Sequence, residues 1–365
     1  MSDTNKQPDT HPNTHPNTHP NTHPNTHPNT HPNTNPYPNI KYQNLVLSGG
    51  GLLGISYIGL FKYLEEHNLT KDIKIVTGCS AGSIFGTLFA LGYTSSEMMT
   101  VIKALNFTDY LKITADSIIN FFKTKGLESG QNFILFLKKC IKDKTGNENI
   151  TFCQILETYK ITLLIGVANI TTSKFELFGP HTTPDIPIYL AIRTSCSIPF
   201  IFEPVVINGN VYCDGGLIDN LPITHLLNII NQNQLLDTTI PDKTVPDKTS
   251  KTSEISDNIE TPQFNQTQDT LAIYLMNKFN PILEDNYKTM SLMHFFNGIF
   301  HTFTTGFINK HLENLKINEK NNRTKIITFE IPCDIMTFIK LNASHDDIDN
   351  IINIAYNYTK EKLVI

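Results

Sequence analysis

The sequence predicts an α/β protein with a mainly parallel central sheet flanked by helices. Short apolar runs alternate with longer segments of helical periodicity over residues 44–235. Three of the apolar runs lead directly into glycine-rich motifs. Strands that alternate with helices form a mostly parallel sheet with both faces covered.

The first expected strand covers residues 44–47, an apolar run that stops at consecutive glycines. Apolar residues recur at helical spacing over 55–66, which predicts a helix. A second strand is expected over 72–76 and a second helix over 83–91. Strand, helix, strand and helix therefore follow one another over about the first 50 ordered residues.

Further strands are expected over 163–169, 175–178 and 211–213. A long helical stretch is predicted from residue 271 to about 317, and a strand over 325–331.

The closing helix is expected to begin after Ser344. Asp347 lies three residues later, which is the spacing of a capping box. Apolar residues then recur at helical spacing up to Ala355.

Two segments are predicted to lie outside the packed domain. Residues 11–34 are six copies of His-Pro-Asn-Thr, so residues 1–40 are expected to form a disordered tail. The histidines of this repeat are either weak metal ligands or part of a solvated arm. Residues 237–269 are polar and contain several prolines, which predicts a flexible insertion. The remaining chain, 41–365, is expected to form one domain.

Composition excludes several classes of protein. Lys and Arg total 29 against 34 Asp and Glu, a net charge of -5 that gives no support to nucleic-acid binding. The six cysteines form no CxxC pair, so neither a disulfide framework nor a zinc site is expected. No apolar run approaches about 18 residues, and the N-terminus has no apolar signal segment. The protein is therefore expected to be cytoplasmic or peripheral on intracellular membranes.

The first motif that suggests chemistry is Gly78-Cys79-Ser80-Ala81-Gly82, between the second strand and the second helix. A Gly-x-Ser-x-Gly motif at such a junction is typical of a nucleophile elbow. Gly78 and Gly82 support the motif because only small residues fit beside the tight turn. The helix that starts there directs free N–H groups toward a developing anion.

The second motif is the run Ser48-Gly49-Gly50-Gly51-Leu52-Leu53-Gly54, between the first strand and the first helix. Consecutive glycines let backbone N–H groups converge on a ligand, either a phosphate or an acyl oxyanion. The spacing matches no nucleotide-binding motif. An oxyanion hole suits the serine about 30 residues later.

The third motif, Asp214-Gly215-Gly216, follows the strand expected over 211–213. The two glycines let this loop approach another loop closely. If Asp214 reaches Ser80, its carboxylate can act as the general base for the hydroxyl. An isolated Asp-Gly-Gly is also compatible with an ordinary turn.

Together these motifs resemble the patatin-like phospholipase family. Four blocks carry the resemblance in family order: residues 48–66, 77–93, 191–205 and 209–222. The third block contains the pattern Ser-x-x-x-Pro-x-x-Phe-x-Pro, and the fourth contains Asp-Gly-Gly with a trailing Asn-x-Pro. The resemblance implies the patatin-like three-layer fold.

The resemblance also implies a Ser-Asp dyad without histidine, with Ser80 as nucleophile and Asp214 as general base. It implies that Gly50 and Gly51 donate backbone N–H groups to the oxyanion, with Gly49 in the same loop. The expected activity is of the phospholipase A type, cleaving glycerolipid esters through an acyl-serine. No metal or other cofactor is expected.

The expected partner is a phospholipid or neutral lipid at a membrane surface, and the oligomeric state stays open. Leu53 departs from the Arg or Lys of most patatin-like sequences, although the branch that resembles animal triglyceride lipases also has Leu there. Triacylglycerol hydrolysis and catalytically weak lipid binding therefore remain alternatives. Transacylation is a third, because it shares the acyl-serine with hydrolysis. The aromatic segment 291–308 is either an interfacial helix or a core helix.

An α/β-hydrolase triad is a further alternative, because it shares the Gly-x-Ser-x-Gly motif. Its histidine would be one of four: His225, His294, His301 and His311.

Overall fold

The computed structural model describes residues 41–106, 109–110, 114–231, 269–277, 324–331 and 344–363, together with 288, 295, 298–299 and 302. The predicted tail, 1–40, lies outside the described residues. So does the predicted insertion, 237–269, apart from its last residue. Most of the aromatic segment 291–308 lies outside them as well.

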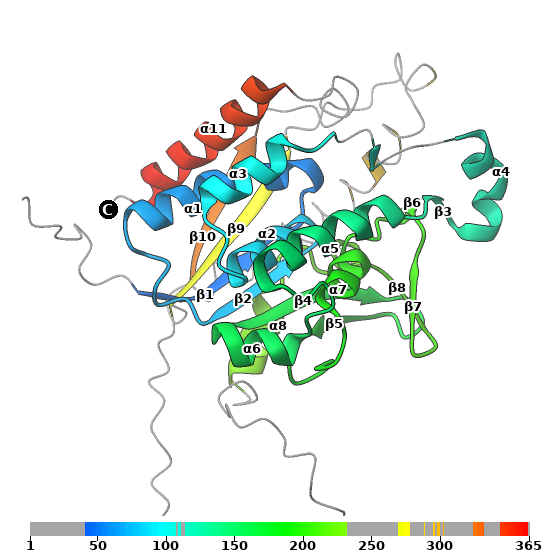
Figure 1. Cartoon of the computed structure of the whole chain (residues 1–365), viewed down its shortest axis with the longest axis horizontal. Coiled ribbons are helices and arrows are strands. Elements are labelled where there is room, and N and C mark those ends of the chain that lie inside the picture. The colour runs from blue at the N-terminus through cyan, green and yellow to red at the C-terminus, as the bar shows by residue number, and fades with distance from the viewer. Residues whose placement is uncertain are drawn as a thin grey trace, which may run out of the picture. The chain divides into compact units, whose positions relative to one another are not determined.

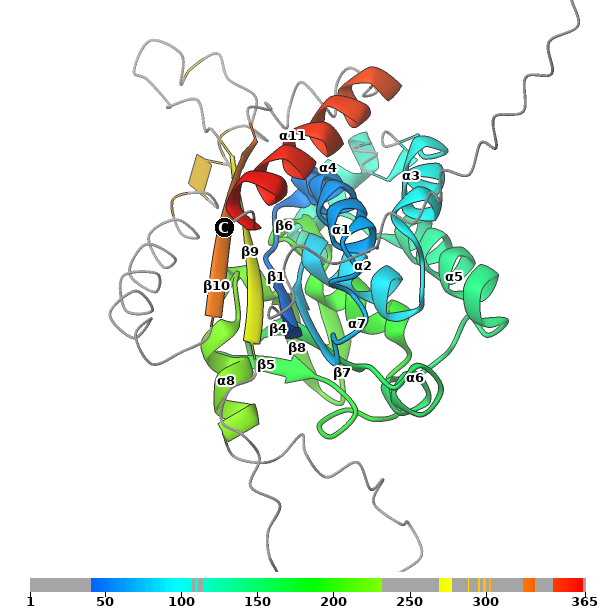
Figure 2. The ribbon, with the colours of Figure 1, turned by 90° about the vertical axis from the view of Figure 1, so that its left-hand side faces the viewer.

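The central sheet is mainly parallel, as predicted. Its parallel part has the order β10-β9-β1-β2-β4, which places β1 at the centre (Figures 1 and 2). These strands are β1 (Tyr42–Leu47), β2 (Ile75–Cys79), β4 (Thr162–Asn169), β9 (Asp269–Asn277) and β10 (Thr324–Ile331).

Three antiparallel strands extend the sheet beside β4: β5 (Lys174–Phe178), β7 (Val205–Ile207) and β8 (Asn210–Asp214). A separate parallel pair is formed by β3 (Gly126–Glu128) and β6 (Phe200–Phe202).

The helix predicted from residue 271 is wrong at its start. Residues 269–277 form β9, a strand that pairs in parallel with β1 on one side and β10 on the other. The segment Leu271–Leu275 is buried throughout. A strand buried on both faces shows no alternation of polar and apolar residues, so periodicity does not separate it from a buried helix.

Helices cover both faces of the sheet. A short 3-10 turn, η1 (Gly51–Ser56), leads into α1, and a second one, η3 (Gly215–Leu217), precedes α8. The α-helices are α1 (Tyr57–Glu66), α2 (Ala81–Ala90), α3 (Ser95–Lys103), α4 (Ala115–Thr124), α5 (Gln131–Thr145), α6 (Phe152–Tyr159), α7 (Ile188–Ser195), α8 (Ile223–Asn231) and α11 (His345–Leu363). In Figure 2, α1 and α11 lie together on one side of the sheet, and α8 lies below its β9–β10 edge.

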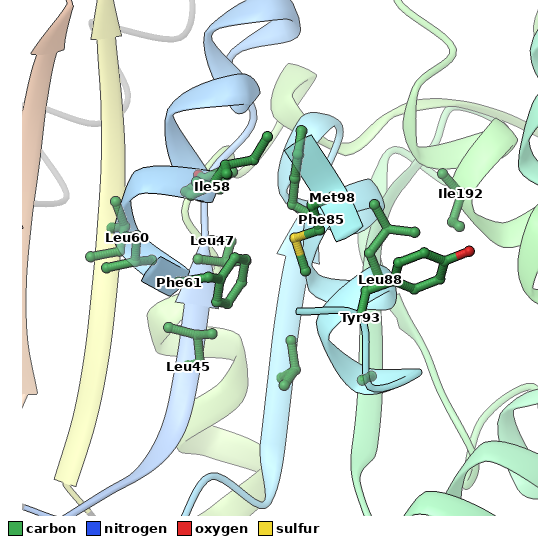
Figure 3. Close-up of a cluster of buried hydrophobic side chains, with 14 of the residues drawn as sticks. Leu45, Leu47, Ile58, Leu60, Phe61, Phe85, Leu88, Tyr93, Met98 and Ile192 are labelled. Atoms are coloured by element: carbon green, nitrogen blue, oxygen red, sulfur yellow. The ribbon is translucent and has the colours of Figure 1, made fainter. Parts of the chain in front are cut away.

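Alternate residues of each strand enter two separate cores. Leu45 and Leu47 of β1 pack in the larger core beneath α1 and α2 (Figure 3). Val46 faces the smaller core, which contains Leu226 of α8. Successive side chains of a strand point to opposite faces, which produces this division. The three-layer arrangement of helices around a central sheet is thus confirmed.

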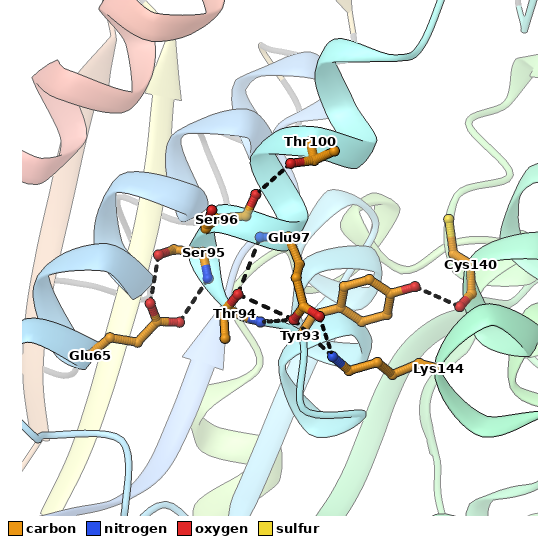
Figure 4. A network of polar contacts seen from close by, with 9 residues as sticks. All are labelled: Glu65, Tyr93, Thr94, Ser95, Ser96, Glu97, Thr100, Cys140 and Lys144. Carbon is orange, nitrogen blue, oxygen red and sulfur yellow. Dashed lines mark hydrogen bonds and ion pairs between the residues drawn. The ribbon is translucent and has the colours of Figure 1, made fainter.

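Polar contacts join the helices of the larger layer. The carboxylate of Glu65 accepts hydrogen bonds from both the backbone N–H and the hydroxyl of Ser95, and so ties α1 to the start of α3 (Figure 4). Glu97 closes the capping box of α3 on Thr94 and pairs with Lys144 of α5 at 2.7 Å. The predicted capping box of Ser344 and Asp347 also forms.

Candidate active site

Ser80 lies in a sharp turn between β2 and α2, the junction that the sequence predicts. Its backbone has φ 50° and ψ -121°, in a region that L residues rarely adopt. A strained backbone conformation persists only where the surrounding structure holds it in place, and such residues are concentrated at functional sites. The residue is 6% exposed, so Ser80 is buried.

Close backbone contacts explain the glycines around this turn. A Cβ on Gly78 would lie 2.3 Å from the carbonyl oxygen of Gly82, and a Cβ on Gly82 would lie 2.2 Å from that of Leu47. A Cβ on Gly54 would meet the Ala81 methyl at 2.8 Å. These glycines allow α2 to begin directly against the end of β1.

Ser195, the last residue of α7, fixes the backbone of Ser80. The Ser80 N–H donates to Ser195 Oγ at 2.8 Å, and that hydroxyl donates to the Gly166 carbonyl on β4 at 2.6 Å. Ser195 begins the Ser-x-x-x-Pro motif, but the motif alone indicated no role for it. Its contact with Ser80 joins residues 115 positions apart.

The glycine loop after β1 lies beside Ser80. A Cβ on Gly49 would lie 2.9 Å from the Ser80 Cβ. The Gly49 N–H donates to the Asn220 carbonyl at 3.2 Å, so this N–H is engaged. The N–H groups of Gly50 and Gly51 have no acceptor among the described residues, as is usual where a helix begins.

Asp214 ends β8 and is fully buried. Its N–H donates to the Ser197 carbonyl at 2.9 Å, and its Oδ1 accepts from the Gly216 N–H at 2.8 Å. Its Oδ2 has no partner of normal hydrogen-bond geometry in the described part of the chain. Burial raises the pKa of Asp214 to about 7, against smaller lowering effects of the Ser80 hydroxyl and the Gly216 N–H.

The glycines of the Asp-Gly-Gly motif permit this placement of Asp214. A Cβ on Gly215 would lie 2.5 Å from the Gly166 carbonyl, and one on Gly216 would lie 2.8 Å from Asn220 Oδ1. The Asp-Gly-Gly loop therefore packs directly against β4 and against the residue that binds Gly49.

The cysteines near Ser80 are buried and protonated. Burial, with the charge of Asp214 nearby, raises the pKa of Cys79 well above its usual value and that of Cys213 to about 11. The five cysteines that the structure describes carry no disulfide. Within the described ranges, no three His, Cys, Asp or Glu side chains are grouped so as to hold a metal ion.

His225 contacts a different carboxylate from the one beside Ser80. Its Nδ1 lies 2.8 Å from Asp219 Oδ2, and its ring packs on Phe175. No hydrogen bond joins His225 to Ser80 or Asp214 in the described structure. The other three histidines of the triad alternative lie outside the described residues. Leu53 is 2% exposed and packs in the larger core.

Comparison with known proteins identifies the class to which this α/β fold and site belong. The model of the patatin-like phospholipase family matches residues 45–227, half of the 365-residue chain. The chain belongs to the patatin-like phospholipase family. The matched segment begins in β1 and ends in α8, so it contains Ser80 and Asp214.

Relatives occur in viruses and fungi. The chain is 35% identical to a probable lipid hydrolase of Invertebrate iridescent virus 6 and 32% identical to an uncharacterized protein of Acanthamoeba polyphaga mimivirus. Each alignment covers 50% of this chain and 62% or 61% of the relative. A lysophospholipase NTE1 from Kluyveromyces lactis is 30% identical over 50% of this chain and 11% of its own length. The chain thus spans about three fifths of the viral relatives.

Among solved structures, VipD from Legionella pneumophila superposes with a TM-score of 0.49 at 15% identity, over 89% of this chain and 67% of that chain. None of the helices in the described ranges is long and apolar enough to traverse a bilayer.

Proposed function

We propose that the protein is a lipid acyl hydrolase of the phospholipase A type that acts through Ser80 and Asp214. The observation that carries the proposal is the buried Asp214 carboxyl beside the Ser80 hydroxyl. Its Oδ2 is unpaired within the described structure, and its pKa is raised to about 7. A carboxylate of that pKa is a better base at neutral pH than an ordinary aspartate.

In the first step, Ser80 Oγ attacks the carbonyl carbon of the ester while Asp214 takes the hydroxyl proton. The C=O double bond becomes a C–O⁻ single bond in the tetrahedral intermediate. The sharp turn at Ser80 and the hydrogen bond from its N–H to Ser195 Oγ support this step, because they fix the backbone that carries the hydroxyl.

The oxyanion is stabilised by the loop after β1. The N–H groups of Gly50 and Gly51 have no other acceptor among the described residues, and Gly49 places the loop against Ser80. Preorganised N–H donors favour the intermediate because its oxygen carries more charge than the ester carbonyl. The start of α2 contributes its positive dipole end.

The intermediate then collapses, and the bond between the carbonyl carbon and the alcohol oxygen breaks. Asp214 returns the proton to the leaving alcohol, and an acyl-serine remains. A water molecule attacks this ester with Asp214 again as base, which releases the fatty acid and restores the Ser80 hydroxyl. The cycle needs no histidine, in keeping with the contact of His225 to Asp219 and not to Asp214.

The names of two relatives, a lipid hydrolase and a lysophospholipase, support a lipid ester as substrate. Leu53 is packed in the core, so its position offers no charge to a phospholipid head group. Triacylglycerol hydrolysis therefore remains an alternative substrate class. Transacylation remains an alternative reaction, since it proceeds through the same acyl-serine. A catalytically weak lipid-binding protein is the alternative without turnover.

The test is acyl release from phosphatidylcholine and triolein dispersions with EDTA present. We expect release by the wild type, and a loss of at least about a thousandfold in Ser80→Ala and Asp214→Asn. Ser96→Ala and Asp143→Asn change exposed residues of the same type and should retain activity. His225→Ala should also retain activity. Loss of activity in this variant would favour the Ser-Asp-His triad.

The products separate the alternatives. Free fatty acid from phosphatidylcholine supports the phospholipase, and release from triolein alone supports a triacylglycerol lipase. Acyl transfer to added monoacylglycerol in place of fatty acid release supports a transacylase. No product from folded wild type would contradict an enzymatic role and leave lipid binding.

A further inference from the structure

Helix α4 carries an apolar face that the described part of the chain leaves uncovered. Ile118, Ile119 and Phe122 are 61%, 75% and 82% exposed. No residue of α4 is buried. Isolated exposed apolar residues are common, but several large ones adjacent on one helix indicate an interaction surface.

Phe200 of β6 extends this face. Its side chain is 50% exposed, and its ring lies 6.3 Å from the ring of Phe121 on α4. Its backbone has φ 70°, a conformation that an aromatic residue rarely adopts. The fold thus holds a large apolar side chain half in solvent, in a strained backbone, directly beside an exposed apolar helix.

The apolar face is joined to the candidate active site by the buried Arg193. One of its nitrogens donates to the Ser129 carbonyl after β3, at 3.0 Å, and to the Glu203 carbonyl after β6, at 2.9 Å. Another donates to Ser197 Oγ. The Ser197 carbonyl in turn accepts the N–H of Asp214.

The strand pair β3–β6, next to α4, also connects the apolar face to the candidate active site. Phe200 pairs with Gly126 of β3, two residues after the end of α4. Phe200 also lies five residues after Ser195, which binds the Ser80 backbone. In Figures 1 and 2, α4 lies toward the end of the molecule to which β9 and β10 point. The glycine loop follows β1 and the Ser80 turn follows β2, and both strands run parallel to β9, so both turns lie at this same end.

Charge around the face favours an anionic lipid surface. Lys123 and Lys125 are exposed at the end of α4, and Asp116 is the helix's one acidic residue. The C-terminal end of α4 is therefore positive, with Glu128 of β3 as the next charge along the chain, although the whole chain has a net charge of -5. Lysines beside exposed apolar side chains complement anionic head groups.

We propose that α4 and Phe200 form the surface by which the protein docks onto an anionic lipid bilayer. This inference rests on the proposed function, because it supplies the route by which a lipid ester reaches Ser80. Ile118, Ile119 and Phe122 insert about 5–10 Å into the boundary between head groups and acyl chains. Lys123 and Lys125 stay at the phosphates.

The test is flotation of the full chain with vesicles of phosphatidylcholine and phosphatidylglycerol at 3:1, compared with pure phosphatidylcholine. We expect binding to the mixed vesicles and a loss of about tenfold or more in affinity for Ile119→Asp/Phe122→Asp. The control Val206→Asp removes an apolar side chain of similar exposure, 66%, on β7. In Figure 2, β7 lies apart from α4, on the other side of the β3–β6 pair, so this variant should bind as the wild type does.

Hydrolysis of a soluble short-chain ester separates docking from catalysis. Ile119→Asp/Phe122→Asp should keep this activity and its melting temperature while losing hydrolysis of vesicle lipid. Unchanged vesicle binding by the double variant, or no binding by the wild type, would overturn the docking surface. A wild-type dimer that the double variant converts to a monomer would assign the face to a second copy. Absence of soluble-ester hydrolysis in the wild type, with vesicle binding intact, would contradict the proposed function alone.

Discussion

Gly49 and Asn220 exchange two hydrogen bonds between the glycine loop after β1 and the loop after Asp214. The Gly49 N–H donates to the Asn220 carbonyl, and Asn220 Nδ2 donates to the Gly49 carbonyl, each at 3.2 Å. The contact joins positions 171 residues apart. It couples the proposed oxyanion donors to the loop that carries the proposed base.

Asn220→Ala should therefore slow the chemical step more than it weakens substrate binding. The variant loses the side-chain bond to Gly49 and keeps the backbone bond, so the loop loosens without detaching. We expect kcat on a soluble ester to fall by about tenfold to a hundredfold with little change in KM. Asn228→Ala, an exposed position on α8, is the control. A rise in KM at constant kcat would contradict the positioning role.

Ser195→Ala should destabilise the fold as well as reduce turnover. The Ser80 N–H and the Gly166 carbonyl, both buried, each lose their contact with the Ser195 hydroxyl. An unsatisfied buried group costs about 1–3 kcal/mol, and urea unfolding should show a loss in that range. Ser129→Ala, at an exposed serine, should change the free energy of unfolding by less than about 0.5 kcal/mol. Equal stability of the two variants would show that the Ser195 contact is dispensable.

Activity should rise with pH through about 7. Asp214 has a pKa of about 7 because burial disfavours its charged form, and only the deprotonated carboxylate can take the Ser80 proton. Below this value log kcat/KM should increase with a slope of one, and above it should level off. A profile on a soluble ester between pH 5 and 9 measures this. A flat profile down to pH 5 would mean that Asp214 titrates as an ordinary aspartate.

The same pKa predicts a stability effect of definite sign. The folded state binds the Asp214 proton more tightly than the unfolded state, since the pKa is raised from 3.8 to about 7. Between these values the unfolded state holds fewer protons, so this group lowers the free energy of unfolding as pH rises. Asp214→Asn cannot ionise, and its melting temperature relative to wild type should be higher at pH 8 than at pH 4. The opposite order would contradict the raised pKa.

The candidate site was predictable as far as its parts are local in sequence. The serine turn, the glycine loop and the Asp-Gly-Gly loop each need glycine for close backbone contact, and glycine in a short motif is visible in one sequence. The partners that hold these parts together were not predictable in the same way. Ser195 and Asn220 act across 115 and 171 residues, and no local spacing encodes such contacts.

The fold was predictable where strands and helices alternate and was wrong where burial hides periodicity. The strand β9 lies inside the sheet, between β1 and β10. A hydrophobic core covers each of its two faces, so its residues are apolar on both. Helix α4 was not singled out, although its apolar residues have helical spacing. Sequence alone does not show that such a face is left without a neighbour, since that depends on the packing of the whole chain.

Gly82 and Gly86 both lie on α2, but only Gly82 lies against backbone, so substitutions at the two positions should differ in effect. In Gly82→Ala the new methyl would lie 2.2 Å from the Leu47 carbonyl oxygen, a backbone atom of the central strand, so α2 must move away from β1. We expect a loss of about 3 kcal/mol or more in urea unfolding and a parallel loss of activity. Gly86→Ala is the matched control, because its methyl meets side-chain atoms and no backbone, Val76 Cγ1 at 3.0 Å and Leu47 Cδ1 at 3.6 Å, and alanine favours the helix by about 1 kcal/mol. Similar losses in both variants would mean that helix packing in general, and not the backbone contact at the turn, requires the glycine.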